Sequence, residues 1–198
     1  MASETGGEYD ISTVDLDDDR YTVTQSLIRN KYRATDSSGA VVLQGKQKLF
    51  RMKEEFPFVD GDGEPAFTVK AGGVLDIAGS YALVDEGTGE PVVSLEEQWT
   101  LFVDRWKVRD PDTEAVLAEI TSRSRLVMVL RHIPYAGALF QLLPHRYEIT
   151  DPDGDHVGTI DGAFSLRDTY EVEIDDASDV PREAVVAAAM VIDAIEGN

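Results

Sequence analysis

Basic side chains are concentrated in one short part of an otherwise acidic chain. The 198 residues carry 38 acidic and 18 basic side chains, which give a formal net charge of −20. Between residues 20 and 53, however, only Asp36 is acidic. Positive side chains at this density could bind an anion. The basic residues of this segment are Arg20, Arg29, Lys31, Arg33, Lys46, Lys48, Arg51 and Lys53.

A hairpin would bring several of these side chains together. If residues 36–39 close a two-residue loop, Lys31 lies opposite Gln44. Arg29 then lies opposite Lys46, and strand alternation places it on the same face as Lys31. The alternative is that these cations pair with carboxylates on neighbouring strands. The residues predicted to bind an anion or a partner are Arg29, Lys31, Arg33, Lys46 and Lys48.

A second segment, between Ile120 and Tyr147, contains no acidic residue. Its apolar part, residues 133–144, predicts a loop or a short amphipathic helix beside the main fold. Such a segment could enter a bilayer interface or contact another protein. The alternative is an inserted helix that covers one end of the fold. The residues predicted to make the apolar contact are Ile133, Tyr135, Leu139, Phe140 and Leu142.

Motifs for catalysis, metal binding or nucleic-acid recognition are not found. The three histidines are not at metal-ligand spacing, and no serine lies in a G-x-S-x-G turn. The segment Asp151–Asp155 has its glycine at the fourth position rather than the sixth, which does not fit an EF-hand loop. The net negative charge repels nucleic acid. We therefore expect no enzyme, no metal, no cofactor and no nucleic-acid partner.

A short phrase that predicts β-hairpins recurs along the chain. It has an aromatic residue, an apolar residue two positions later and an aspartate two positions after that. Strand alternation puts the aromatic and apolar residues on one face, and the aspartate opens a turn. The four copies are irregularly spaced, so we expect neither a solenoid nor a propeller. They are Tyr32–Asp36, Tyr81–Asp85, Trp106–Asp110 and Tyr147–Asp151.

The C-terminal residues predict a helix that must be enclosed. A helix over residues 181–195 would carry only one charge between Ala184 and Ile195, that of Asp193. A helix that is apolar all round needs cover on every side, and a sheet of many hairpins can supply it by closing around the helix. The alternative, a helix lying on one face of an open sheet, would require polar residues on its outer side. A mainly β protein is therefore expected, with its sheet closed around the C-terminal helix.

Three residues of this helix are predicted to have structural roles. Ala188 and Val191 would pack inside the sheet. A buried unpaired carboxylate is costly, so we expect Asp193 to have a hydrogen-bonding partner. At the last helical turn its side chain would either reach the barrel mouth or pair with an arginine such as Arg105 inside the barrel.

The length fits one domain over residues 1–198, with residues 1–20 as an acidic lead-in and residues 21–195 as the barrel and its helix.

The chain has no cysteine, and its first residues lack the basic start and apolar run of a secretory signal. The closing apolar run is shorter than the ~20 residues of a membrane span. We expect a cytoplasmic protein, with a location peripheral to the membrane as the alternative. The excess of acids is typical of a halophile with molar salt in its cytoplasm.

Three phrases resemble the LURP-one-related family, which is similar in fold to the tubby C-terminal domain and to phospholipid scramblases. They are SLIRNKYRATDSSGAVVLQGKQKLF, VSLEEQWTLFVDRWKVRD and AMVIDAIEGN. The resemblance covers about residues 21–195. It implies a closed antiparallel barrel of about twelve strands around a hydrophobic C-terminal helix.

Two functions follow from these observations. The first is a non-catalytic module that binds a protein or a small ligand. The alternative, suggested by the tubby and scramblase resemblance, is a peripheral membrane domain that binds phospholipid, with an anionic lipid headgroup as its ligand. Molar salt shortens the reach of a basic surface toward a membrane to about 3 Å, which favours the first function.

Overall fold

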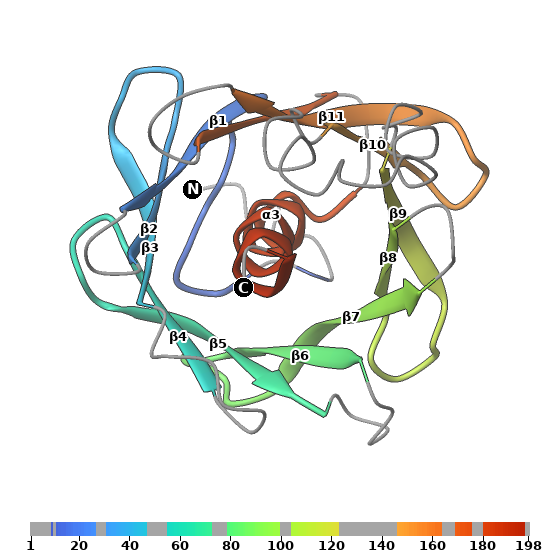
Figure 1. The fold of residues 1–198 in the computed structure, drawn as a ribbon. Helices are drawn as coiled ribbons and strands as arrows, with labels where there is room; N and C mark the ends of the chain where they lie inside the picture. Colours follow the sequence, from blue (N-terminus) through green and yellow to red (C-terminus); the bar gives the residue numbers. More distant parts are fainter. Residues whose placement is uncertain are drawn as a thin grey trace, which may run out of the picture.

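The chain folds into a closed barrel of twelve antiparallel strands with one helix along its axis (Figure 1). This computed structural model confirms the expected architecture. The residues that the structure describes are 9, 11–26, 31–46, 55–72, 79–99, 104–122, 146–163, 169–175 and 180–196.

In the described residues, the elements follow one another as twelve strands and then the helix. They are β1 (Arg20–Ser26), β2 (Lys31–Thr35), β3 (Val41–Lys46), β4 (Glu55–Asp60), β5 (Pro65–Ala71), β6 (Ser80–Asp85), β7 (Pro91–Trp99), β8 (Asp104–Arg109), β9 (Val116–Ser122), β10 (Arg146–Thr150), β11 (His156–Ala163), β12 (Thr169–Ile174) and α3 (Arg182–Glu196).

Each strand pairs with the strands before and after it in the sequence, and β1 pairs with β12 to close the ring. Every strand therefore has a neighbour on both sides, and the sheet has no free edge. Because the strands alternate in direction, the connections lie alternately at the two ends of the barrel. We call one of them the turn end; it holds the connections at residues 36–40, 60–64, 85–90, 110–115 and 151–155.

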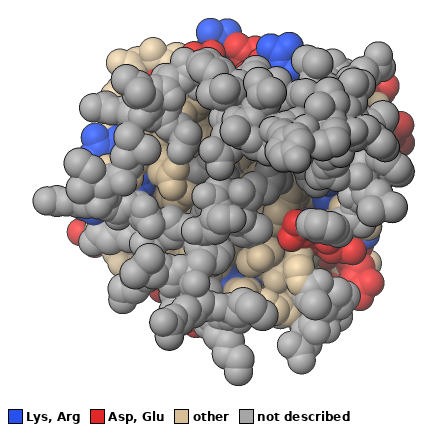
Figure 2. Space-filling model, in the orientation of Figure 1, with Lys and Arg blue, Asp and Glu red and all other residues tan. Residues whose placement is uncertain are grey.

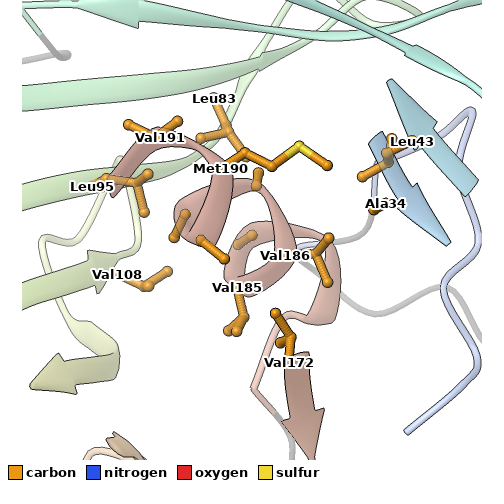
Figure 3. Packing of buried hydrophobic residues seen from close by; sticks show 14 of the residues in the cluster. Ala34, Leu43, Leu83, Leu95, Val108, Val172, Val185, Val186, Met190 and Val191 are labelled. Carbon is orange, nitrogen blue, oxygen red and sulfur yellow. The ribbon is translucent and has the colours of Figure 1, made fainter. Parts of the chain in front are cut away.

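Helix α3 is buried on all sides, as the absence of polar residues predicts. Every side chain from Ala184 to Ile192 is at most 3% exposed. Figure 3 shows helix side chains such as Val185 and Met190 pointing toward strand residues on several sides, including Leu83 and Val172. The many alanines keep the helix narrow enough for the barrel interior. The predicted bounds, 181–195, differ by one residue from the observed ones.

The turn end contains one more copy of the recurring phrase than the sequence analysis found. The additional copy is Phe56–Asp60, and its aspartate accepts hydrogen bonds from the amides of Asp62, Gly63 and Glu64. With this copy included, the first four aspartates follow one another at 24- or 25-residue intervals. The spacing is thus regular over the first four copies. The five aspartates are Asp36, Asp60, Asp85, Asp110 and Asp151.

The hairpin between β2 and β3 differs from the predicted two-residue loop. The amide of Asp36 donates to the carbonyl of Ala40, and Gly39 has a φ of 84°, so three residues form the loop. A bulge then adds one more residue on β3. Together they move the register by two positions. Lys31 consequently lies opposite Lys46 rather than opposite Gln44.

Residues 11–19, which were expected to form a lead-in, contribute to the core at the turn end. Ile11, Val14 and Leu16 are buried in the same cluster as the strand and helix residues. The amide of Leu16 donates to Glu183 Oε1 at 3.1 Å, which ties this segment to the first turn of α3. Glu183 is also favourably placed for the positive end of the helix dipole.

Candidate functional site

Strand β2 presents two cations on the outer wall of the barrel. Lys31 and Arg33 are exposed, whereas Tyr32 and Ala34, which alternate with them, are buried in the core. The alternation follows from the apolar character of Tyr32 and Ala34, which turns the opposite face of the strand to solvent.

The neighbouring strands place no carboxylate opposite these two cations. Lys31 lies between Ser26 of β1 and Lys46 of β3. Arg33 lies between Thr24 of β1 and Gln44 of β3. We call Lys31, Arg33 and Lys46 the basic strip; the position of Lys46 comes from its backbone register. Arg29 and Lys48, which were predicted to belong to the same site, lie outside the described residues.

The other basic side chains that the structure describes have partners. Arg182 donates to the carbonyl oxygen of Asp18 at 2.9 Å. Lys31 and Arg33 form no ion pair or hydrogen bond in the described part of the chain. Pairing with neighbouring carboxylates, the alternative weighed from the sequence, is therefore not observed for these two residues. The ion pairs elsewhere are Arg20–Glu173, Lys70–Glu55, Arg105–Glu119, Lys107–Glu119, Arg109–Glu96 and Arg146–Asp161.

The distance over which the basic strip attracts an anion depends on the salt concentration. The screening length is about 8 Å at physiological ionic strength and about 3 Å at 1 M. The net charge of −20 opposes the approach of an anion from a distance. The strip is therefore suited to attraction at contact distance, where the Lys31 and Arg33 side chains meet the charges of the partner directly. Figure 2, in the same orientation as Figure 1, shows blue and red side chains together at the upper rim and a group of red side chains at the lower right.

The predicted apolar contact lies outside the described residues. It comprises Ile133, Tyr135, Leu139, Phe140 and Leu142.

The predicted structural residues lie in α3. Ala188 and Val191 are buried in the core. Asp193 belongs to the same helix, and its side chain is outside the described part. The predicted position of Arg105 inside the barrel is wrong. Trp106 and Val108 occupy the inward positions of β8, so alternation turns Arg105 outward, where it pairs with Glu119 at 3.7 Å.

The inward face of β6, β7 and β8 contains a group of residues that the site prediction missed. The Tyr81 and Trp106 rings are tilted, with centroids 6.0 Å apart, and Glu97 lies opposite Trp106 in the strand register. Burial, and then the nearby Glu97 charge, raise the pKa of Tyr81. The indole Nε1 of Trp106 is buried, and no described residue forms a hydrogen bond with it. Tyr81 and Trp106 are each the first residue of a copy of the recurring phrase. This pattern is the sequence signal that could have identified them.

A shallow groove of about 240 Å³ lies where β1, β11 and β12 meet. It is lined by charges of both signs, and Arg20 pairs with Glu173 across it at 2.5 Å. His156 at its margin lies 3.2 Å from Glu148. Within the described ranges, no group of three or more His, Asp or Glu side chains is arranged to hold a metal ion. Within the same ranges, no helix is long and apolar enough to cross a bilayer.

Comparisons with known proteins agree with the barrel architecture. Residues 41–193, more than half of the chain, match the family model described as LURP-one-related. A crystal structure of a protein from Arabidopsis thaliana is similar, with a TM-score of 0.57 and 9% sequence identity. The match covers 96% of this chain and 99% of that chain. At this identity, the likeness shows a common fold. No curated protein matches the chain significantly in sequence.

Proposed function

This chain belongs to the LURP-one-related family, and on that basis we propose that it is a non-catalytic binding module that recognises its partner through the basic strip. The partner carries negative charge. Catalysis is no part of the proposal, because the family and the closed barrel suggest a non-enzymatic binding domain.

One observation carries the proposal: Lys31 and Arg33 are exposed cations that have no acidic partner among the described residues, in a protein of net charge −20. The other described basic side chains meet a carboxylate or a carbonyl oxygen. Because no described carboxylate neutralises Lys31 and Arg33, both cations are available to bind an anion from solution. Their close spacing also costs some stability through repulsion, which a bound anion would relieve.

The proposal includes an environment of high salt, which the large excess of acidic side chains supports. At such salt concentrations the basic strip attracts an anion only when the two are in direct contact. A peripheral domain that binds phospholipid is the second candidate. It is supported by the apolar segment 133–144, within the acid-free sequence between Ile120 and Tyr147, which could enter the bilayer interface.

Affinity capture in about 2 M KCl tests the proposed function, since high salt suppresses non-specific attraction. Three baits are compared: wild type, K31E/R33E, and the control K70E/R146E, which changes the net charge equally on exposed positions of other strands. We expect a partner that wild type and the control retain and K31E/R33E loses. Equal capture by all three baits would contradict a role for the basic strip.

Sedimentation with vesicles of anionic archaeal-type lipids in the same salt separates the two candidates. Binding that a Leu139/Phe140 variant alone loses would favour the phospholipid-binding domain, anchored by apolar insertion. Binding that K31E/R33E alone loses would indicate recognition of a lipid headgroup by the strip. If wild type does not sediment with the vesicles, the phospholipid candidate fails and the soluble module remains.

A further inference from the structure

We infer that the partner of the basic strip is an extended acidic segment of another protein, with carboxylates at alternate positions. This inference rests on the proposed function and goes beyond it by naming the chemistry and the conformation of the partner. The segment lies along β2 on the outer wall of the barrel, and side chains alone hold it there.

The closed sheet explains why side chains must carry the recognition. Proteins that bind extended peptides often add the peptide as a further strand at a free sheet edge. Here β1 pairs with β12, and β2 pairs with both β1 and β3, so the described sheet has no edge at which a strand could be added. A peptide on this wall meets only the outward-facing side chains.

The spacing of the cations matches that of an extended peptide. Lys31 and Arg33 are separated by one residue on a strand, so their Cα atoms lie about 6.6 Å apart along its axis. Alternate residues of an extended peptide have the same spacing, and both point to the same side. Two carboxylates of such a peptide can therefore meet Lys31 and Arg33 together. Lys46 lies opposite Lys31 in the backbone register.

The surroundings of the strip favour a peptide over an enclosed phosphate group. Thr24 and Gln44 lie on either side of Arg33, and their hydroxyl and amide groups can hydrogen-bond to peptide carbonyl and N–H groups. Arg33 itself can hold a carboxylate with two parallel hydrogen bonds. Small anions are usually bound by donors that converge in a hollow. The groove that the described residues form is instead at β1, β11 and β12.

Binding of defined peptides tests the inference. Fluorescence anisotropy would compare a labelled peptide of alternating Asp and Thr, eight residues long, with a peptide of the same composition in which the four Asp residues are consecutive. The proteins are wild type, K31E/R33E and the control K70E/R146E, whose folding is checked by circular dichroism. Inorganic polyphosphate and phosphatidylglycerol vesicles serve as competing anions, at the salt concentration used for the peptide measurements.

We expect the alternating peptide to bind more tightly than the consecutive one. Reversing both charges should weaken binding about tenfold or more, because each reversal removes an attraction and adds a repulsion. The control variant should bind like wild type. Equal affinity for the two peptides would overturn the match of spacing on which the inference depends.

The other outcomes separate this inference from the proposed function. Binding of polyphosphate or vesicles through the strip, without binding of either peptide, would overturn the inference and leave the proposed function intact. Self-association in sedimentation velocity that K31E/R33E abolishes would identify a second copy as the occupant and would also overturn it. If no anion distinguishes K31E/R33E from the control, both the inference and the proposed function fail.

Discussion

Asp85 and Asp110 each accept hydrogen bonds from their own turn and from the N-terminal segment. Burial by itself would raise the pKa of Asp85, but hydrogen bonds from Ser12, and further bonds from Gly87 and Thr88, outweigh it and lower that pKa. In Asp110, hydrogen bonds from the Thr113 amide and the Tyr9 hydroxyl lower the pKa to about 2. These aspartates therefore favour the folded state in their ionised form.

The substitution Asp110→Asn should lower stability at neutral pH and lose this effect in acid. The pKa of Asp110 is lower in the folded state than the ~3.9 of an unperturbed aspartate, so its stabilisation is complete above about pH 4. It is lost as the pH falls from 4 through 2. Urea unfolding at pH 7, 5, 3 and 2 should show that the difference between wild type and the variant becomes smaller in acid.

Asp112→Asn is the matched control for this experiment. Asp112 lies in the same turn and carries the same charge, and its side chain makes no hydrogen bond in the described part of the chain. We expect a smaller loss of stability for this variant at pH 7. A difference between wild type and Asp110→Asn that stays constant from pH 7 to pH 2 would show that ionised Asp110 does not stabilise the fold.

The helix and the barrel depend on each other. The strands surround α3, and the helix fills the space that their inward side chains leave. The N-terminal segment adds a contact at the turn end through Leu16 and Glu183. A single apolar helix of this kind would be poorly soluble without the sheet, and the sheet would contain a large void without the helix.

The substitution Ala188→Leu should destabilise the protein by about 1–3 kcal/mol, because interiors packed on all sides have no room for three further carbon atoms. Ala188 is 0% exposed in the middle of α3. Thermal and urea unfolding would measure the change. Ala115→Leu, at an exposed turn position, makes the same chemical change without core packing. Equal stability of the two variants would contradict the enclosure of the helix at Ala188.

The whole molecule combines a mainly apolar interior with a strongly acidic composition. The net charge of −20 makes its carboxylates repel one another, and folding brings them closer together. Many of the described cations are used to pair with some of these carboxylates on neighbouring strands. The remaining repulsion is reduced by dissolved salt.

Stability should therefore rise with salt concentration. The screening length falls from about 10 Å at 0.1 M to about 3 Å at 1 M, so we expect a higher melting temperature in 2 M KCl than in 0.1 M KCl at pH 7. The control is the same comparison near pH 4.3, the isoelectric point of the sequence, where the increase should be much smaller. An equal increase at both pH values would assign the effect to something other than screening of the net charge.

The sequence by itself determined the architecture. The apolar run from Ala184 to Ile192 has no side that tolerates water, and the alternating strands have only one face that does. A closed sheet around the helix satisfies both requirements. The recurring phrase likewise located four of the five aspartate turns, because each needs only local chemistry. Phe56–Asp60 was missed although it carries the same pattern.

The register and the site were decided by the tertiary structure. A positive φ at Gly39 and one bulge moved the pairing of β2 and β3 by two residues, and neither follows from the residue types alone. The surroundings of Lys31 and Arg33 depend on which residues the neighbouring strands place opposite them. The pairing of β1 with β2 placed Ser26 and Thr24 there rather than one of the chain's 38 acidic residues. Such cross-strand neighbours depend on the register of each strand pair, so the order of the residues alone does not reveal whether a cation has a partner.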